Sequence, residues 1–367
     1  MKILLLSDLN SAHTQKWATA LAGEGIEVGI FTLNEADSDW WNGYSAIRVF
    51  RPLTFSRKRI AGNPFSKLVY LKAISHLKRV IREFRPDVVH AHYATSYGLL
   101  GALSGFRPFI ISVWGSDVMN FPQRSFFHRQ LLQFNFRKAD LLLSTSKAIA
   151  DCIQSLTAKP TEIVHFGIDT NVFVPGMERI IGEAEDLVIG TVKSLEPIYG
   201  IDILLKAFHV LSNRHPGKRL KLLIVGGGSL SEAYQTLASE LGIAHLTTFT
   251  GKVTYEKVPF YIQNLDIFAN LSRNESFGVA VLEAEACGKP VVVTAVGGLK
   301  EVMLPGITGF AVPPEQVEET ALAFERLLDE KLRKQLGAAG RQFVLEKYTL
   351  EKGLSQLIDL YKKLLLR

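Results

Sequence analysis

The sequence contains few cysteines and no long apolar stretch. Its two cysteines, Cys152 and Cys287, lie far apart among 367 residues, so they give no disulfide framework and favour a reducing cytoplasm. No CxxC or histidine-rich pattern indicates a metal site. No apolar run approaches the roughly 18 residues that a membrane span requires. The first apolar run, Ile3–Leu6, is too short for a signal peptide and predicts a strand.

Positive charge is concentrated in the first half of the chain. Residues 1–175 hold 20 Lys+Arg and 13 Asp+Glu, whereas residues 176–367 hold 22 and 23. Between Arg51 and Arg85, ten basic residues stand beside a single acid, Glu83. Such asymmetry predicts that the two halves meet different partners.

The chain is long enough for two domains, and both halves show the same alternation of elements. Short apolar runs alternate with amphipathic helical segments, which is the pattern of doubly wound parallel sheets. The predicted strands of the first half are Lys2–Leu6, Glu27–Thr32, Ala46–Phe50, Val88–Ala91, Phe109–Val113 and Leu141–Ser144. Those of the second half are Leu187–Val192, Leu220–Val225, Leu246–Thr250, Ile267–Asn270 and Pro290–Thr294. Phe173–Asp186 has no clear period and is the predicted linker.

The segment Asn274–Pro290 holds two carboxylates eight positions apart at the start of a predicted helix. A buried strand is predicted just before it, and the helix 279–287 is ended by glycine and proline. Glu275 then lies at the helix mouth and Glu283 about two turns inside, roughly 12 Å along the axis. This separation suits an elongated polar ligand such as a nucleotide sugar. The backbone N–H groups expected to be unpaired and to bind an anion are those of Ser276, Phe277 and Gly278.

The chain resembles glycosyltransferase family four, the group 1 transferases of the GT-B fold. The resemblance rests on Glu275 and Glu283 with Ser-Phe-Gly after the first acid, and on Gly297-Gly298 farther along. It implies retaining transfer without a metal ion. It also implies that Glu275 lies beside the donor sugar and that Glu283 binds the ribose.

The resemblance further implies the domain organisation. Two Rossmann-like, doubly wound α/β domains would face an interdomain cleft, because ligands bind outside the carboxyl ends of parallel strands. Residues 1–172 would bind the acceptor, and residues 173–349 would bind the nucleotide-sugar donor. Residues 350–367 would form a helix that packs back on the first domain.

Other candidate donor residues follow the strands of the second half. Lys193 stands where the resembled family has an arginine that touches the diphosphate, and lysine is still a point charge for phosphate. Tyr199 stands near the family's second basic position, which this chain does not fill. Gly227 either lets the backbone approach a ligand or only makes a tight turn. Lys252 and Val253 follow the next strand, where the family holds the base through backbone groups.

The first half offers four further candidates. His13 takes the place of a family glycine at a helix mouth and could bind a phosphate or an acceptor hydroxyl, or no ligand. His92 lies near the end of its strand, where core packing is an equal interpretation. Trp114 replaces a family histidine beside the donor sugar and could stack on a sugar ring. Asp117 is a catalytic candidate, although capping the next helix is an equal interpretation.

The helix predicted over 65–84 has one apolar face and one basic face. It is either a core helix with a solvated basic face or, together with the loop Ser56–Arg59, a surface that rests on anionic lipid at up to ~1 kcal/mol per charge. No recognition module accompanies this charge, so we expect no nucleic-acid partner. Asp37 and Asp39 form a lone Asp-x-Asp in a polar stretch, which we interpret as a surface loop, and we expect no metal requirement.

We therefore predict a retaining glycosyltransferase that uses a nucleoside-diphosphate sugar, expected to be a UDP-sugar, and no separate cofactor. The acceptor is a hydroxyl of a glycan or lipid-linked molecule in cell-surface polysaccharide or glycoconjugate synthesis, and the location is cytoplasmic, extending to the inner face of the membrane. Glu275, Lys193, His13 and Asp117 are the catalytic candidates. The alternatives are a sugar-nucleotide epimerase of the same fold and a non-catalytic sugar-nucleotide or membrane-binding protein.

Overall fold

The structure is a computed structural model that describes residues 1–52, 66–176, 183 and 185–366, with the backbone alone for 66–71. The predicted basic loop Ser56–Arg59 lies outside the described residues, as does the middle of the predicted linker. The chain divides into two compact units. The first unit consists of residues 1–166 with 353–367, and the second of residues 167–352.

The first unit ends slightly before the predicted domain boundary at residue 172. At its end, the segment that leaves the first unit lies against the segment that returns to it. A Cβ atom on Gly167 would lie 2.3 Å from the Cα of Leu350, so only glycine allows the two connecting segments to touch. Ile168 N donates to Tyr348 O at 2.8 Å, and Leu350 N donates to Ile168 O at 2.9 Å. The two connections are thus held side by side by their backbones.

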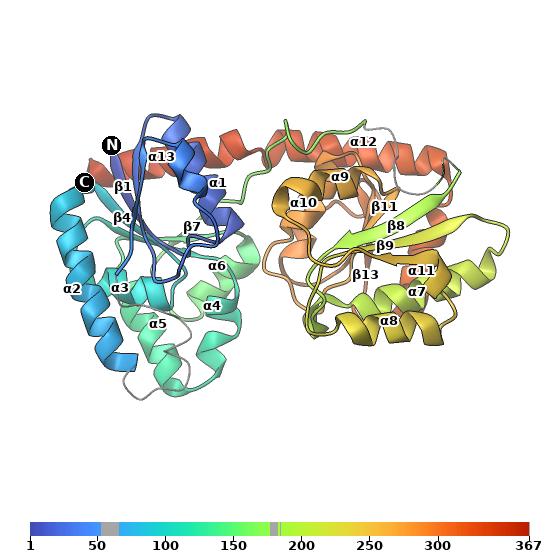
Figure 1. The fold of residues 1–367 in the computed structure, drawn as a ribbon, viewed down its shortest axis with the longest axis horizontal. Coiled ribbons are helices and arrows are strands. Elements are labelled where there is room, and N and C mark those ends of the chain that lie inside the picture. The colour runs from blue at the N-terminus through green and yellow to red at the C-terminus, as the bar shows by residue number, and fades with distance from the viewer. Residues whose placement is uncertain (53–65, 177–182, 184, 367) are drawn as a thin grey trace. The chain divides into compact units, whose positions relative to one another are not determined.

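The first unit is built on a seven-stranded parallel sheet in the order β3-β2-β1-β4-β5-β6-β7 (Figure 1). The strands are β1 (Lys2–Leu6), β2 (Glu27–Phe31), β3 (Ile47–Phe50), β4 (Val88–His92), β5 (Phe109–Val113), β6 (Leu141–Ser144) and β7 (Thr161–Ile163). The helices are α1 (Ala12–Gly23), α2 (Ser66–Phe84), α3 (Ser96–Ser104), α4 (Ser116–Met119), α5 (Phe126–Lys138) and α6 (Lys147–Gln154). The strand order reverses between β1 and β4, which is the switch point of this sheet.

The second unit repeats this plan with a six-stranded parallel sheet in the order β10-β9-β8-β11-β12-β13 (Figure 1). The strands are β8 (Leu187–Val192), β9 (Leu220–Val225), β10 (Thr247–Phe249), β11 (Ile267–Asn270), β12 (Val291–Thr294) and β13 (Gly309–Val312). The helices are α7 (Ile201–Arg214), α8 (Ser231–Glu240), α9 (Val258–Gln263), α10 (Val279–Ala286), α11 (Val317–Arg326) and α12 (Glu330–Lys347). Its switch point lies between β8 and β11. The predicted class, two Rossmann-like domains with parallel sheets, is confirmed.

The central strands are largely apolar because helices cover both faces of each sheet. Ile3 to Leu6 in β1 are completely buried, and so are Val291 and Val292 in β12. Two edge strands, β7 and β13, were not predicted from the sequence. β7 reads Thr-Glu-Ile and β13 begins with glycine, so neither has the apolar run that marks a central strand.

The last helix, α13 (Leu350–Leu365), packs within the first unit through one apolar face. Leu354, Leu357 and Tyr361 on this face are buried. Gln356 Nε2 donates to Ile163 O in β7 at 2.8 Å. None of the described helices is both long and apolar enough to cross a bilayer. Both cysteines are free.

His90 in β4 is completely buried beneath α13. Its Nδ1 lies 2.7 Å from the Tyr361 hydroxyl and its Nε2 lies 2.7 Å from the Ser112 hydroxyl. Burial lowers the pKa of His90 to about 3, so the ring is neutral in the folded protein at pH 7.

This burial makes the stability of the first unit depend on pH. The unfolded chain takes up a proton on this histidine near pH 6.5, whereas the folded chain does so only near pH 3. The stabilisation is therefore complete above pH 6.5 and is lost as the pH falls toward 3, by up to about 1.4 kcal/mol per pH unit. We expect His90→Asn to flatten the slope of unfolding free energy between pH 6 and pH 4, measured by denaturant titration. Equal slopes for the variant and the parent would contradict this.

Candidate functional site

Two loops of the second unit leave its sheet at the switch point. β8 ends at Val192 and is followed by Lys193, while the neighbouring β11 ends at Asn270 and is followed by the loop that carries Glu275. Neighbouring parallel strands have their carboxyl ends at the same edge of the sheet. Ligands of open parallel sheets bind at this edge, at the point where the strand order reverses. A cation and a carboxylate that are 82 positions apart in the sequence therefore meet at this edge.

Lys193 and Glu275 form a largely buried ion pair. Lys193 Nζ donates to Glu275 Oε2 at 2.5 Å, and the two side chains are 14% and 12% exposed. The Ser272 hydroxyl donates to the same oxygen at 3.3 Å, and Asn270 Nδ2 does so at 3.5 Å. A buried pair persists only when such additional hydrogen bonds satisfy its remaining atoms. The end of β11 therefore fixes the position of the Glu275 carboxylate.

Tyr199 completes the surroundings of the Lys193 ammonium group. Lys193 Nζ lies 4.6 Å from the centroid of the Tyr199 ring, which is a cation–π contact. Tyr199 was predicted to contribute to the donor site, although the motif around it departs from the family pattern. The structure brings this aromatic ring to the cation, where the family pattern has a second basic group.

Glycines allow the loops around this ion pair to touch through their backbones. A Cβ atom on Gly226 would lie 1.9 Å from Lys193 O, and one on Gly228 would lie 2.5 Å from Leu195 O. A Cβ atom on Gly297 would lie 2.1 Å from Glu275 O. The glycine run after β9 thus presses against the Lys193 loop. The structure shows close packing of this run against another loop, and the role of Gly227 with a ligand stays a prediction.

Glu283 lies inside α10 and is almost completely buried, at 4% exposed. The Tyr255 hydroxyl donates to Glu283 Oε1 at 2.8 Å. Burial and the adjacent Glu283 carboxylate raise the pKa of Tyr255 above its ordinary value, so the hydroxyl keeps its proton at neutral pH. Sequence reasoning missed Tyr255, because a hydrogen-bond partner 28 positions away leaves no local signal.

Arg273 is a second residue that sequence reasoning missed. Its guanidinium donates to both oxygens of Asp202 at 3.0 and 2.9 Å, to Pro197 O at 2.5 Å, and to the Glu315 carboxylate. Its backbone N–H donates to Ile198 O at 2.7 Å. Arg273 therefore ties the turn that carries Tyr199 to the loop that carries Glu275.

The remaining donor candidates lie in neighbouring loops of the second unit. Gly226 N donates to Gly251 O at 3.1 Å, which joins the loops after β9 and β10. A Cβ atom on Gly227 would lie 3.3 Å from Lys252 N. Lys252 is exposed and Val253 is half-buried. Their role with a nucleotide base stays a prediction.

Ser276, Phe277 and Gly278 lead into α10. Gly278 has φ of +105°, a conformation that favours glycine, and it precedes the first residue of the helix. Phe277 is 1% exposed and packs with its ring centroid 5.9 Å from that of Tyr348. Ser276 and Phe277 both take part in further interactions. The predicted use of their amides for an anion stays a prediction.

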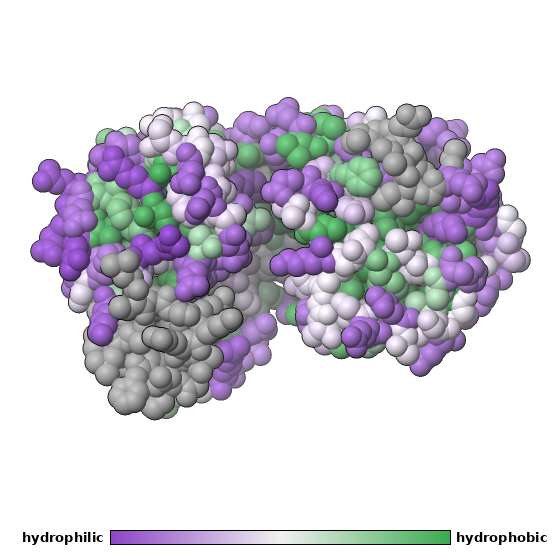
Figure 2. All heavy atoms as spheres, in the orientation of Figure 1, coloured by the Kyte–Doolittle hydropathy of each residue, from purple (hydrophilic) through white to green (hydrophobic). Residues whose placement is uncertain are grey.

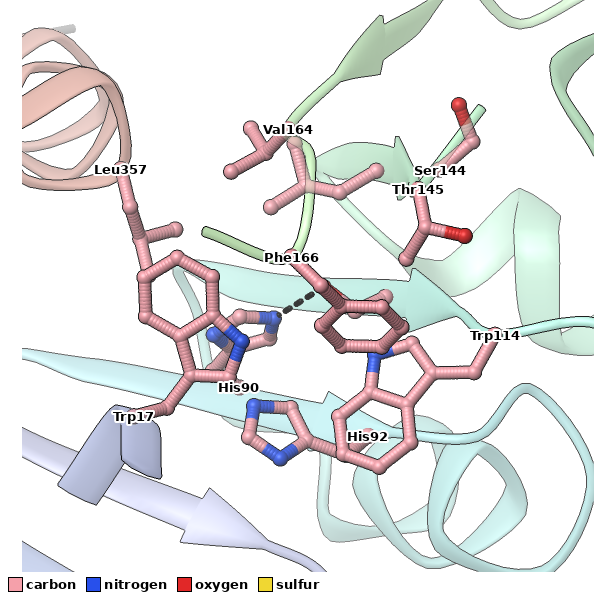
Figure 3. A pocket seen from close by; sticks show the side chains of 11 residues that line it. Trp17, His90, His92, Trp114, Ser144, Thr145, Val164, Phe166 and Leu357 are labelled. Atoms are coloured by element: carbon pink, nitrogen blue, oxygen red, sulfur yellow. Dashed lines mark hydrogen bonds between the residues drawn. The ribbon is translucent and has the colours of Figure 1, made fainter. Parts of the chain in front are cut away.

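The first unit has an aromatic cluster at its own switch point. The ring of His13, after β1, stacks on Phe166 with 3.9 Å between centroids, and Trp114 contacts both rings. His92, at the end of β4, lies 4.6 Å from Trp114. Figure 3 shows His92, Trp114 and Phe166 around one pocket, which is also lined by Trp17 and Thr145 among others. The structure thus brings together three candidates that are separated along the sequence.

The histidines of this cluster are uncharged. Burial, together with Lys16, lowers the pKa of His13, and burial with the neighbouring histidines lowers that of His92 well below the ordinary value. His92 Nδ1 lies 3.1 Å from the Ser7 hydroxyl, which in turn lies 2.6 Å from the Thr14 hydroxyl. At neutral pH each ring offers one donor and one acceptor rather than a positive charge.

Asp117 holds two loops through its carboxylate. Its Oδ2 accepts from Ala94 N at 2.8 Å and its Oδ1 accepts from Gly115 N at 2.8 Å. The side chain is 2% exposed, and burial raises its pKa although these amides oppose the shift. These contacts give Asp117 a positioning role after β4 and β5, and its catalytic role stays a prediction.

The Asp-x-Asp stretch is fully exposed, since Asp37, Ser38 and Asp39 all lie on the surface ahead of a short turn. Among the residues that the structure describes, no group of three or more His, Cys, Asp or Glu side chains is arranged to hold a metal ion.

The contacts of Arg273 predict its contribution to stability. Arg273→Gln would leave Asp202 and Glu315 without their partner, at a cost of about 1–2 kcal/mol, which corresponds to about 2–4 °C in Tm per kcal/mol for a domain of this size. Arg214 is the matched control, because it is similarly exposed and also pairs with two acids, Glu318 and Glu325. Within the described part of the chain it binds no backbone carbonyl of a turn, so we expect Arg214→Gln to change Tm by less than half as much in calorimetry. Equal shifts would contradict the special position of Arg273.

Matches to two known protein families together span most of both units. Residues 2–146 match the family of glycosyl transferase 4-like domains, and residues 178–343 match the glycosyl transferases group 1. The chain is 38% identical over 360 residues to the D-inositol 3-phosphate glycosyltransferase of Mycobacteroides abscessus, which covers 88% of this chain and 77% of that protein.

Solved structures show the same fold. Sucrose-phosphate synthase from Thermosynechococcus elongatus superposes with a TM-score of 0.86 at 23% identity and covers 99% of both chains. Anabaena HepE in complex with UDP and glucose superposes with a TM-score of 0.83 at 19% identity, over 99% of this chain and all of the other. The matched families, the relative at 38% identity and the two parallel-sheet units together show that this chain belongs to the group 1 glycosyltransferases, family four of the GT-B fold.

Proposed function

We propose that this glycosyltransferase is a retaining enzyme that transfers a sugar from a UDP-sugar, without a metal ion, to a hydroxyl of a glycan or lipid-linked acceptor. The observation that carries the proposal is the Lys193–Glu275 pair at the switch point of the second sheet. The proposed setting is synthesis of cell-surface polysaccharide or glycoconjugate.

The charge at this point suits a nucleotide-sugar diphosphate. When a sugar–phosphate bond breaks, negative charge grows on the leaving diphosphate and positive charge grows on the sugar. Lys193 supplies fixed positive charge for the leaving diphosphate. Glu275 lies next to Lys193 and supplies negative charge near the sugar. Without a ligand the two side chains neutralise each other, and the incoming diphosphate shares the ammonium group with the carboxylate.

Glu283 is placed to bind the ribose. A buried carboxylate can accept two hydrogen bonds from adjacent hydroxyls, and one of its oxygens already accepts from Tyr255. The hydroxyls of a ribose can donate to such a carboxylate, because hydrogen bonds stabilise a buried charge. The relative HepE, solved with UDP and glucose, supports a uridine donor.

The transfer step proceeds on one face of the sugar. The C1–O bond to the diphosphate breaks as the acceptor hydroxyl approaches from that same side, and the departing phosphate oxygen takes the hydroxyl proton. The new C1–O bond forms on the face that the phosphate left, so the configuration is retained. Lys193 stabilises the departing charge, and Glu275 orients the sugar while its positive charge develops.

The acceptor is assigned to the first unit. Its switch point presents the neutral His13 and the half-buried ring of Trp114, which can stack on a sugar or polyol ring. The excess positive charge of this half suits an acceptor that carries phosphate or lipid phosphate. The relative named for D-inositol 3-phosphate makes a phosphorylated polyol the first soluble acceptor to assay.

Glu275→Gln tests the centre of the proposal. It keeps the size of the side chain but removes the charge, so we expect kcat for transfer from UDP-sugar to fall by about 10²–10³-fold, the loss typical of removing one group that acts on the transition state. The assay is release of UDP that depends on the acceptor. Glu319→Gln, an exposed acid on α11, is the control and should change kcat by less than twofold.

Glu283→Gln should separate binding from chemistry. If the carboxylate binds ribose equally in the ground and transition states, neutralising it weakens donor binding but not the chemical step. We therefore expect the donor KM to rise about tenfold with kcat nearly unchanged. Steady-state kinetics over a range of UDP-sugar concentrations measures the split. A fall in kcat with an unchanged KM would contradict the ribose role.

The same assay decides between the alternatives. A sugar-nucleotide epimerase would consume UDP-sugar without acceptor-dependent release of UDP, and a non-catalytic binding protein would bind UDP-sugar without turnover. Release of UDP that rises with acceptor concentration supports transfer.

A further inference from the structure

Tyr255 links two parts of the proposed donor site. It begins the short turn η6 (Tyr255–Lys257), directly after residues 251–254, where the nucleotide base is predicted to bind. Its hydroxyl donates at 2.8 Å to Oε1 of Glu283, the acid that is predicted to bind the ribose. Base and ribose are adjacent groups of one nucleotide, so a residue between these two elements is well placed to act on ribose binding.

The exposed ring of Tyr255 is ordinary, whereas the direction of its hydroxyl is not. The residue is 40% exposed, and Figure 2 shows hydrophilic and hydrophobic side chains interspersed over the drawn face of the second unit. A tyrosine at a surface usually keeps its polar tip in water. Here the tip reaches inward to a carboxylate that is 4% exposed, which indicates a role for the hydroxyl group itself.

Glu283 needs a hydrogen-bond donor for two reasons. Burial removes water from its carboxylate, and a charge taken out of water is costly unless hydrogen bonds replace the lost hydration. Glu283 also lies in the last turn of α10, where the backbone carbonyls carry a partial negative charge that disfavours an anion. A hydroxyl that donates to a carboxylate makes a charge-assisted hydrogen bond, which is stronger than a neutral one. The Tyr255 hydroxyl therefore stabilises the charged form of Glu283.

The ring of Tyr255 rests against a segment that is tied to α10. Its centroid lies 6.1 Å from that of Phe173, which is 1% exposed. Arg341 in α12 donates to Phe173 O at 2.6 Å and to Ala286 O, at the end of α10, at 2.7 Å. The support of the phenol and the helix that carries Glu283 are thus joined by one guanidinium group, and packing limits the orientations of the phenol.

We propose that Tyr255 is a positioning residue that holds the Glu283 carboxylate in one orientation for the ribose, and that it thereby makes the enzyme prefer ribonucleotides to 2′-deoxyribonucleotides. A carboxylate has about four lone-pair positions, and the phenol occupies one of them. The other positions then keep a fixed direction, so a ribose hydroxyl can bind without first reorienting the acid. The inference rests on the ribose role of Glu283 in the proposed function.

Loss of the phenol hydroxyl would release the carboxylate. Tyr255→Phe keeps the ring and its contact with Phe173, but it leaves Glu283 to rotate or to bind water. Each nucleotide would then have to order the acid as it binds, and that cost reduces what the 2′-hydroxyl contributes to affinity. The measurable consequence is a smaller preference for UDP over 2′-deoxy-UDP.

The test measures binding of UDP and of 2′-deoxy-UDP to the full chain by isothermal titration calorimetry. We expect the parent to bind UDP about tenfold more tightly than 2′-deoxy-UDP, the loss typical of removing one hydrogen bond to a charged group. Tyr255→Phe should lower the affinity for UDP about tenfold and reduce the ratio of the two affinities to below about threefold. The control is Tyr261→Phe, a partly buried tyrosine of α9, which should leave both affinities as in the parent.

A double variant separates positioning from a merely structural role. Glu283→Ala removes the group that Tyr255 holds, so in this background Tyr255→Phe should change the affinity for UDP by less than about twofold. A hydroxyl that only supported its own turn would cause the same loss in both backgrounds. Thermal unfolding establishes that each variant is folded.

Three results would overturn the inference. If the parent prefers UDP and Tyr255→Phe keeps that preference unchanged, Tyr255 does not position the acid, and the ribose role of Glu283 still stands. Equal losses with and without the Glu283 carboxylate lead to the same conclusion. If the parent binds both nucleotides equally, the ribose role of Glu283 fails and the positioning role fails with it.

Discussion

The ion pair between Lys193 and Glu275 is the interaction on which the proposed donor site depends. It joins the ends of two neighbouring strands at the switch point, and its burial requires that both partners remain paired, either with each other or with a ligand. Gly226 and Gly297 occupy positions where any side chain would push these loops apart. Arg273 sets the turn that carries Tyr199 against the same ion pair. A diphosphate can enter such a site because it offers Lys193 a second anionic partner.

The first unit uses the equivalent edge of its sheet differently. Its switch point holds neutral histidines and aromatic rings rather than an ion pair, and its positive charge lies on the outer helices α2 and α5. The neutral state of His90, His92 and His13 follows from burial, which makes their charged forms costly. The proposed function therefore uses the charged pair of the second unit for the diphosphate and the uncharged rings of the first unit for the acceptor.

The sequence alone was sufficient to predict the central strands and the loops that carry Lys193 and Glu275, because buried parallel strands are continuous apolar runs. The predicted helix mouth at Glu275 was wrong: α10 begins only at Val279, so Glu283 lies about one turn inside the helix rather than two. The edge strands β7 and β13 were missed, since polar or glycine-containing edges carry no such run. The partners of these acids could not be predicted either. Tyr255 reaches Glu283 and Arg273 reaches Asp202 across 28 and 71 positions, and only the packing of the loops sets those contacts.

A crystal structure of the chain with an intact UDP-sugar tests the central claim most directly. The ion pair at the switch point predicts a diphosphate oxygen within hydrogen-bond distance of Lys193 Nζ, the sugar beside Glu275, and both ribose hydroxyls on Glu283. A donor bound elsewhere, with Lys193 and Glu275 still paired to each other and no ribose hydroxyl on Glu283, would contradict it.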